Sequence, residues 1–520
     1  MRSARPIALV GVLCLSLSLA SCGTRRADKD FNAGNTLAQG SATGGTTGDA
    51  AGTTSGGTTG VGTGGTTGPV VSSTTGGTTG GTSGGTTGST GSTGATTGGT
   101  SGATSGGTTG GSTGGGGNSA SDVGVTATTI NLGNIVTKSG GFGPDQFTPF
   151  YYGAAAYFDA LNASGGINGR KVVFNTCDDA GSDTGNSDCA RKLVDNQKVF
   201  AFVANNCLAC GGLSYISGKA VPSVGGLAID FRDYALPHFW RYSGNPYPQD
   251  GHIGYKGKLY QGTQQYRWFK QKLGVTKAGV VYYDNSQASK TAGLSIISAL
   301  KAEGIEATAY PENVALPQYD SAVIDMKQKG ITAVWDSIDI SGNQNLCKSI
   351  DSNGLQLKAK VSTIAVWSQA VGSQFSSPCR KYIYSVEDPG SLTYDQTSNA
   401  EIAKFRAASK RYFPNRESKL YQWSVDGWGS AMWFDEAARS CGANLTRVCL
   451  EKFLNSPKEY TARGLWFPRS NLKFDFATKK TLYRCVQIDQ WDDTQKTFVV
   501  RAPFQSTCYT TPYISYDAPV

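Results

Sequence analysis

The chain has 520 residues and a formal net charge of +9, and this length exceeds what a single hydrophobic core usually supports. No run of basic residues is interleaved with aromatic side chains, so the sequence argues against nucleic-acid binding. The only two histidines, His238 and His252, are not at metal-ligand spacing, which argues against zinc and against histidine-based catalysis.

The N-terminus has the pattern of an export signal. Arg2 and Arg5 precede an apolar run, residues 7–20, that is too short to span a membrane, so residues 1–21 are predicted to be a signal peptide. Cys22 follows two small residues, and this ending resembles a bacterial lipobox. The resemblance implies that a lipid on Cys22 holds the protein on a membrane surface. The alternative is an ordinary signal peptide followed by an incidental cysteine.

Residues 22–122 form a low-complexity segment. Residues 35–120 are nearly all Gly, Thr or Ser, and they lack the apolar content that would offset the entropy of ordering, so a disordered linker is predicted. A flexible chain of this length spans roughly 55 Å, enough to hold a domain clear of a bilayer or to cross part of a cell wall. We adopt the simpler interpretation, a spacer with no role beyond reach.

The first folded region begins near Val123 and alternates strand and helix patterns. Segments rich in β-branched and aromatic residues predict strands, and apolar residues at helical spacing predict helices. The expected strands are 129–134, 171–175, 199–203, 221–225 and 239–242, and the expected helices are 148–162, 188–196 and 213–218. This alternation predicts a parallel sheet covered on both faces by helices.

A second α/β region follows a break at residues 245–248, which read Asn-Pro-Tyr-Pro and predict a crossover between lobes. Each of its three helices is followed by a glycine in the position of a C-terminal cap, namely Gly304, Gly330 and Gly354. The expected strands are 278–283, 306–310, 332–335 and 360–363, and the expected helices are 292–303, 321–329 and 343–353.

The last part of the chain is predicted to return to the first lobe and then to the second. Residues 382–385 are expected to be the strand that re-enters the first lobe, followed by helices at 400–412 and 423–440. Residues 485–488 and 497–500 predict a hairpin that packs on the second lobe.

One stretch, Thr148 to Asp179, resembles the substrate-binding proteins of ABC importers, in particular the leucine/isoleucine/valine-binding family. Shorter matches follow later in the chain, among them residues 425–428 and 437–442, and the resemblance covers roughly residues 123–500. The residues that carry the resemblance in the longer stretch are Gly153, the run Ala156-Tyr157-Phe158-Asp159, Asn162, the run Gly165-Gly166-Ile167-Asn168-Gly169, and Asp178-Asp179.

The resemblance implies the type I periplasmic-binding fold, which is α/β with two Rossmann-like lobes joined by a three-strand hinge. We expect 123–244 and 381–464 in lobe 1, and 245–380 and 465–520 in lobe 2, with crossovers near 245–247, 379–384 and 464–467. It also implies a monomer that delivers a small molecule to an ABC permease and its ATPase subunits, with no cofactor and no metal.

In open α/β sheets, ligands bind beyond the carboxyl ends of the strands. The loops at those ends therefore supply the candidate contacts, with two aromatic side chains to clamp an apolar or planar ligand and polar groups to fix its ends. The candidate ligand-binding residues are Phe142, Asn205, Asn206, Gly226, Ser286, Asp336, Asp339 and Trp367. Many of these would instead only cap helices or satisfy loop backbone.

The sequence departs from the amino-acid binders of that family at these loops. The hydroxyl side chains expected after the third and fourth strands are missing, since the loops read Asn205-Asn206-Cys207 and Gly225-Gly226-Leu227. The tyrosine expected in residues 285–290 is also missing. A standard branched-chain amino acid is therefore not the expected ligand.

Ten cysteines remain after Cys14 in the signal peptide and Cys22 are set aside, and an exported chain favours disulfides. Local pairing predicts Cys347 with Cys379, Cys441 with Cys449, and Cys485 with Cys508. Cys177, Cys189, Cys207 and Cys210 are expected to form two more bonds, in an order that the sequence leaves open. The CxxC spacing of the last two also fits a redox motif, but we favour a structural bond.

Two other interpretations of the sequence are weaker. The acidic residues Asp178, Asp179, Asp183 and Asp188 do not have the spacing of a calcium-binding EF-hand loop, so a loop and a helix start are expected there. An enzyme is the least supported class, because neither a nucleophile elbow nor a phosphate loop occurs. A ligand sensor for a signalling partner, without transport, stays the main alternative to a transport protein.

Overall fold

The computed structural model describes residues 117–140, 145–362, 371–387, 399–420, 422–456, 460–466, 479–504 and 506–519. The predicted signal peptide, Cys22, Phe142, Trp367 and the linker up to residue 116 lie outside these residues. The linker was expected to reach residue 122, but Asn118 already donates a side-chain hydrogen bond to the carbonyl of Asn168, and the backbone N–H of Arg447 donates to Asp122. Among the described helices, none is long and apolar enough to cross a membrane.

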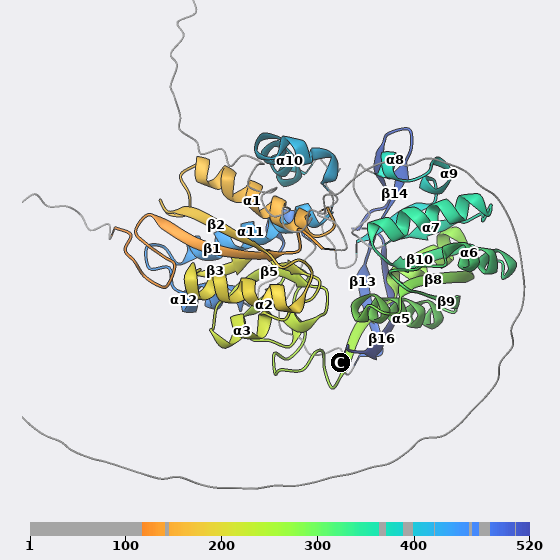
Figure 1. Cartoon of the computed structure of the whole chain (residues 1–520), viewed down its shortest axis with the longest axis horizontal. Helices are drawn as coiled ribbons and strands as arrows, with labels where there is room; N and C mark the ends of the chain where they lie inside the picture. The colour runs from red at the N-terminus through yellow and green to blue at the C-terminus, as the bar shows by residue number, and fades with distance from the viewer. Residues whose placement is uncertain are drawn as a thin grey trace, which may run out of the picture. The chain divides into compact units, whose positions relative to one another are not determined.

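The first sheet is entirely parallel, as the alternating pattern predicted (Figure 1). Its strand order is β2-β1-β3-β5-β4, with β6 paired to β5. The strands are β1 (Thr129–Val136), β2 (Lys171–Asp178), β3 (Ala201–Val203), β4 (Asn206–Cys207), β5 (Ser223–Ala228) and β6 (Phe239–Arg241). A parallel sheet must be covered on both faces, because its strands are apolar on both sides.

Helices cover both faces of this sheet (Figure 1). One group is α1 (Thr148–Ala163), α10 (Ala400–Tyr412) and α11 (Gln422–Ser440), and the other is α2 (Asp183–Arg191), extended by a π-helical turn (Lys192–Asn196), and α3 (Leu213–Gly218). Strand β1 contributes side chains to the cores under both helix groups. Leu132 lies in the same core as Phe150 of α1, and Ile135 lies in the same core as Leu213 of α3. A Cβ on Gly153 would lie 1.8 Å from the carbonyl oxygen of Ser424, so glycine there permits the close approach of α1 and α11.

The second sheet has the order β15-β14-β12-β11-β10-β8-β9. Its strands are β8 (Lys277–Tyr283), β9 (Glu306–Glu312), β10 (Ala333–Ser337), β11 (Ala359–Val361), β12 (Ile383–Glu387), β14 (Gln487–Asp492) and β15 (Thr497–Ala502). The strands from β9 to β12 are parallel, and the β14–β15 hairpin adds antiparallel to β12. The hairpin therefore packs on the second lobe as predicted, although Cys485 itself ends a different strand.

One strand assignment was wrong. Residues 382–385 were expected to re-enter the first lobe, but β12 pairs in parallel with β11 in the second sheet. The residues just before β12 are also tied to this lobe, because Cys379 is disulfide-bonded to Cys347. A strand pattern shows that a segment is buried in a sheet, but it does not show which sheet. The crossover expected at 379–384 is therefore also wrong, since α10, the next element after β12, packs on α1.

The second sheet is likewise covered on both faces by helices. Helices α4 (Gln264–Leu273) and α5 (Gln287–Ala302) share a core with Val280 of β8, whereas α6 (Tyr319–Gln328) and α7 (Ile340–Ser352) share one with Val281. The glycines predicted to end three of these helices, Gly304, Gly330 and Gly354, have positive φ angles of 67°, 68° and 61°. Short helices α8 (Val371–Gln374) and α9 (Ser377–Arg380) precede β12.

A small antiparallel sheet was not predicted. It has the order β13-β16-β7, formed by β7 (Lys258–Gly262), β13 (Thr481–Cys485) and β16 (Cys508–Asp517). Strand β16 contacts α4 and α5, so this sheet belongs to the second lobe. The remaining elements are α12 (Arg447–Leu454) and three 3₁₀ turns, Arg232–Tyr234, Pro414–Lys419 and Ala462–Gly464.

All five disulfides are present. The three predicted pairs are confirmed: Cys347–Cys379, Cys441–Cys449 and Cys485–Cys508. The structure also decides the order that the sequence left open, with Cys177–Cys189 and Cys207–Cys210. The CxxC cysteines are thus bonded to each other, a pairing that fits both the structural and the redox interpretation.

Candidate functional site

A hydrogen bond joins the strand-end loops of the two lobes. The backbone N–H of Ile340, the first residue of α7, donates to Oε1 of Gln146 at 3.3 Å. Gln146 lies between β1 and α1 in the first lobe, and Ile340 follows β10 in the second. Both loops leave the carboxyl end of a parallel strand, which is where open α/β sheets bind ligands. The candidate site is therefore formed by the residues at these two sets of strand ends.

In the first lobe, Asn205 and Gly226 hold the sheet edge together. Oδ1 of Asn205 accepts a hydrogen bond from the backbone N–H of Ile135 at 2.8 Å. The backbone carbonyl of Asn205 accepts one from the backbone N–H of Leu227 at 2.7 Å. A Cβ on Gly226 would lie 2.8 Å from the same carbonyl oxygen, so glycine permits the close approach of these two loops. The side chain of Asn205 is thus engaged in linking β1, β3 and β5.

Asn206 offers an acceptor at the same edge. Its side chain is fully buried, and its Nδ2 donates to the carbonyl of Phe147, just before α1, at 3.4 Å. None of the described residues donates a hydrogen bond to its Oδ1. A buried acceptor without a donor costs about 1–3 kcal/mol, so this oxygen favours a donor from a ligand or from water.

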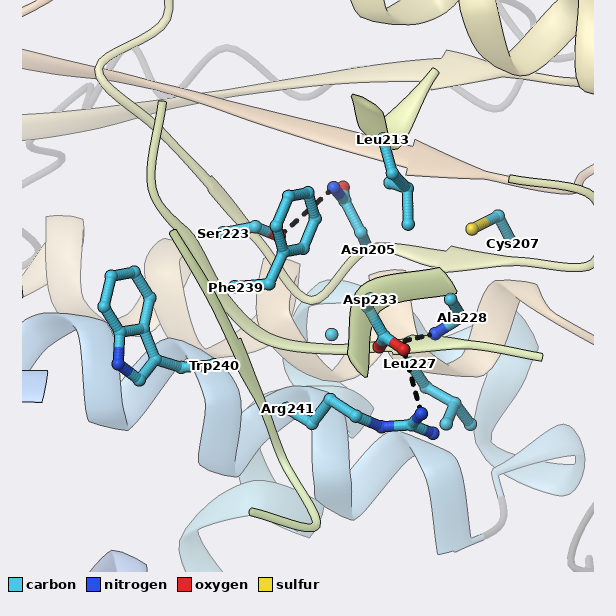
Figure 2. A pocket seen from close by; sticks show the side chains of 11 residues that line it. Asn205, Cys207, Leu213, Ser223, Leu227, Ala228, Asp233, Phe239, Trp240 and Arg241 are labelled. Carbon is cyan, nitrogen blue, oxygen red and sulfur yellow. Dashed lines mark hydrogen bonds and ion pairs between the residues drawn. The ribbon is translucent and has the colours of Figure 1, made fainter. Parts of the chain in front are cut away.

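Figure 2 shows a small cavity inside the first lobe, next to Asn205. Its volume is about 10 Å³, which is space for about one water molecule and not for a solute. A buried ion pair borders it, with 2.9 Å between Arg241 and Asp233, and Asp233 also accepts the backbone N–H of Ala228. Burial raises the pKa of Asp233 to about 6, although the Arg241 charge acts in the opposite direction. The ion pair holds the end of β5 in place, because Ala228, which bonds to Asp233, is the last residue of that strand.

In the second lobe, Asp339 lies among hydroxyl groups. It caps α7 by accepting the backbone N–H of Gly342 at 2.8 Å, and it accepts the hydroxyl of Tyr283 at 2.6 Å. The hydroxyl of Tyr319 lies 3.2 Å from that of Tyr283. Burial first, and then the hydrogen bond to Asp339, raises the pKa of Tyr283, so this hydroxyl stays a donor at neutral pH. Asp339 is only half-buried, which leaves it accessible to a ligand.

Asp336 lies deeper than Asp339. Its carboxylate forms an ion pair with Lys360 at 2.9 Å, with both side chains fully buried, and it accepts Nδ2 of Asn343 at 2.9 Å. Burial lowers the pKa of Lys360, and the attraction of Asp336 opposes that shift. Both carboxylate oxygens of Asp336 thus have partners within the lobe.

Ser286 precedes α5 and is half-buried, and its hydroxyl does not cap the helix. The neighbouring Ser289 is tied to the sheet instead, donating to the carbonyl of Ser337 at 2.6 Å and accepting the N–H of Tyr283 at 2.8 Å. The structure therefore leaves the hydroxyl of Ser286 at the strand-end surface, where a ligand contact was predicted.

The acidic residues at the end of β2 organise the loop that follows it, as predicted. Asp178 accepts the backbone N–H groups of Lys138 and Ala180, at 2.8 and 3.0 Å, while Asp179 accepts the Thr137 hydroxyl at 2.7 Å. Burial raises the pKa of Asp179 more than its hydrogen bonds with Asn186, Gly181 and Thr137 lower it. Within the described part of the chain, His, Cys, Asp and Glu side chains form no group of three or more that would hold a metal ion.

Residues 129–496, well over half of the chain, match the family model described as periplasmic binding protein. The chain belongs to this family. Homologues in it are substrate-binding proteins and not enzymes, and they work outside the cytoplasm with ABC transporters. None of the curated protein sequences compared with the chain matches it.

Solved structures of periplasmic binding proteins have the same fold at low sequence identity. A fatty acid ABC transporter substrate-binding protein from Thermomonospora curvata is 16% identical with a TM-score of 0.57, over 75% of this chain and 94% of that one. A solute-binding protein from R. palustris in complex with benzoate is 14% identical, with a TM-score of 0.56, over 75% of this chain and 98% of that one. A branched-chain amino acid transporter substrate-binding protein from Streptococcus pneumoniae, in complex with isoleucine, is 15% identical. Its TM-score is 0.55, over 74% of this chain and 100% of that one.

Several residues in and behind this candidate site were not predicted from the sequence. Tyr283 supplies a hydroxyl just before the loop 285–290 where a tyrosine was expected, and Tyr319 comes from the start of α6. Lys360 was assigned only to a strand, and a buried lysine has no sequence signal of its own. Gln146 precedes the predicted helix by two residues, but its contact with Ile340 depends on the meeting of two lobes.

Proposed function

We propose that this protein is an extracytoplasmic solute-binding lipoprotein that captures a small molecule between its two lobes and delivers it to an ABC importer. The ligand class is an amino acid, an amide or a related organic acid. The observation that carries the proposal is the contact of Gln146 with Ile340, which brings the strand ends of both sheets to one place. Family membership supports binding in place of catalysis.

The polar groups at these strand ends favour a ligand that donates hydrogen bonds at both ends. Asp339 offers a half-buried carboxylate in the second lobe, and Asn206 offers an acceptor without a donor in the first. Asn205, Gly226, Ser286 and Asp336 stay predicted contacts or supports. Phe142 and Trp367, which lie outside the described residues, are proposed as the apolar walls. An ammonium or amide N–H suits the two acceptors, because charge-assisted bonds to carboxylates are the strong ones.

The ligand is best identified by thermal shift on the purified mature protein. L-isoleucine, L-isoleucinamide, benzoate and a fatty acid form a suitable first panel, because a compound that binds only the folded state raises the melting temperature. We expect a shift with L-isoleucinamide that Asp339→Asn reduces. The matched control is Asp320→Asn, which changes an exposed carboxylate in α6 of the same lobe. A shift that is equal in Asp339→Asn and in the unmodified protein would remove Asp339 from the site.

Transport is tested separately from binding. Uptake of the radiolabelled compound should fall in cells that lack the protein and return with the intact gene. Uptake that is unaffected by the deletion, for a compound that binds the pure protein, would favour a sensor for a signalling partner. The lipid on Cys22 is part of the proposal, because it would hold the protein at the membrane where the importer lies.

A further inference from the structure

A buried lysine lies behind the turn that carries Asp339. The Lys360 ammonium contacts Oδ2 of Asp336 at 2.9 Å, the Ser362 hydroxyl at 2.6 Å, and Oδ1 of Asn343. An ammonium has three protons to donate, so this set of acceptors satisfies it. The charge is fully buried, and its contacts all lie within the second lobe.

Stability alone does not explain this ion pair. Removing two charges from water costs several kcal/mol per ion, and a buried pair can often be replaced by apolar residues without loss of stability. A buried, fully bonded network does fix the geometry of the groups attached to it. The groups attached to this network therefore indicate what it does.

Asn343 connects the network to the β10–α7 turn. Because Lys360 contacts Oδ1 of Asn343, the amide nitrogen of Asn343 must face the other way. That Nδ2 donates to Asp336 at 2.9 Å, to the carbonyl of Ile338 at 3.2 Å and to the carbonyl of Asp339 at 3.1 Å. The backbone on both sides of the Ile338–Asp339 bond is thus fixed from the interior of the lobe.

We propose that Lys360 and Asp336, acting through Asn343, are positioning residues that hold the Asp339 carboxylate in its ligand-binding orientation. The inference rests on the proposed function, because it takes Asp339 as a ligand contact. In the orientation that the network holds, Oδ1 of Asp339 accepts from Gly342 and from Tyr283, and the rest of the half-buried carboxylate is left for a donor on the ligand.

The test separates positioning from stability. The double variant Asp336→Leu/Lys360→Met replaces the pair by apolar side chains of similar length, and we expect its melting temperature to stay close to that of the unmodified protein. Amide hydrogen exchange at Gly342 reports the cap bond to Asp339 directly and needs no ligand. We expect this exchange to rise about fivefold, the effect of losing one helix cap, and the affinity for L-isoleucinamide to fall.

The matched control is Arg267→Met/Glu303→Leu, which removes an ion pair with a buried carboxylate at the C-terminal end of α5 in the same lobe. It should leave exchange at Gly342 unchanged. If the first double variant does not fold, Asn343→Ala breaks the connection to the turn while leaving the ion pair, and the same rise is expected. Unchanged exchange at Gly342 in a folded variant of either kind would overturn the inference.

The two proposals fail in different ways. If Asp339→Asn leaves L-isoleucinamide binding unchanged while exchange at Gly342 responds to Asp336→Leu/Lys360→Met, the network positions Asp339 but the proposed ligand contact is wrong. If Asp339→Asn weakens binding and the double variant changes neither exchange nor affinity, the ligand contact stands and the positioning role is wrong.

Discussion

At the scale of single residues, the carboxylates near the strand ends have different environments and therefore different roles. Asp339 is half-buried and caps a helix, so it has both a fixed orientation and access to a ligand. Asp336 and Asp233 are buried beside a lysine and an arginine, so they stabilise the loops behind the site. The same residue type is thus proposed as a ligand contact in one place and supports the backbone in another, and burial decides between the two.

The buried Asp233 predicts how stability depends on pH. Its pKa is raised to about 6 in the folded protein, whereas an unfolded aspartate titrates near about 3.9. Between about pH 4 and 6 the folded state therefore holds more protons than the unfolded state, and this group's contribution to the free energy of unfolding falls as pH rises.

The measurement is urea denaturation at several pH values for the unmodified protein and for Asp233→Asn. Asparagine keeps an acceptor for the Ala228 N–H but does not titrate. We expect the unfolding free energy of the unmodified protein, relative to that of Asp233→Asn, to fall between about pH 4 and 6 and to level off above about pH 6. A difference that is independent of pH would show that Asp233 titrates normally.

At the scale of elements, close helix contacts and disulfides fix the two lobes internally. Gly153 and Gly427 lie where α1 crosses α11, and a Cβ at either position would come within 2.0 Å of a carbonyl oxygen on the other helix. In the second lobe, Cys347–Cys379 ties α7 to α9 and so fixes the chain that enters β12. Asp339 caps the N-terminus of α7 at the candidate site. The disulfide fixes the same helix further along, at Cys347.

The disulfides predict different stability losses because they close loops of different length. Cys347 and Cys379 are 32 residues apart, and Cys441 and Cys449 are 8 apart. The loop-entropy model gives about 3.7 kcal/mol for the first bond and about 2.5 kcal/mol for the second. Denaturation of the two double Cys→Ala variants checks the order. Equal losses would indicate that native contacts, and not loop entropy, set the contribution of these bonds.

At the scale of the whole molecule, the proposal combines an N-terminal anchor, a linker and a ligand-binding domain. Residues 117–125 already contact the first lobe, through Asn118, Ser121 and Asp122, so the end of the linker is attached to that lobe. In this proposal the N-terminal anchor holds the first lobe through the linker, and the second lobe closes by a hinge motion when a ligand binds.

The anchor gives a prediction for the full chain. Lipid transfer to Cys22 should place the protein in the membrane fraction and should label it with a radioactive fatty acid. Cys22→Ser should abolish the label and release the protein, because a linker rich in Gly, Thr and Ser has no membrane affinity of its own. Cys14→Ser, inside the predicted signal peptide, is the control and should keep the label. A labelled Cys22→Ser protein would contradict the lipobox interpretation.

Much of the fold could be predicted because its signals are local. The 400–412 helix has the predicted bounds, and the glycine caps at 304, 330 and 354 are where helical periodicity ends. The β12 strand was assigned to the wrong lobe, since pairing partners lie far apart in sequence. The sheet of β7, β13 and β16 was missed for the same reason, because its strands come from residues 258–262 and from two segments after 480.

The sequence by itself determined the two-lobed α/β class and the three local disulfides, because hydrophobic period, glycine caps and short cysteine spacings act between neighbours in the chain. The family followed from the resemblance of the stretch Thr148 to Asp179 and is shown by the match of residues 129–496 to the family model. Only the tertiary structure decided the pairing of Cys177, Cys189, Cys207 and Cys210, the lobe of β12 and the different environments of Asp336 and Asp339. The physical reason is that burial and hydrogen-bond partners belong to positions in space. Lys360 lies 24 residues from Asp336 in sequence and 2.9 Å away in the fold.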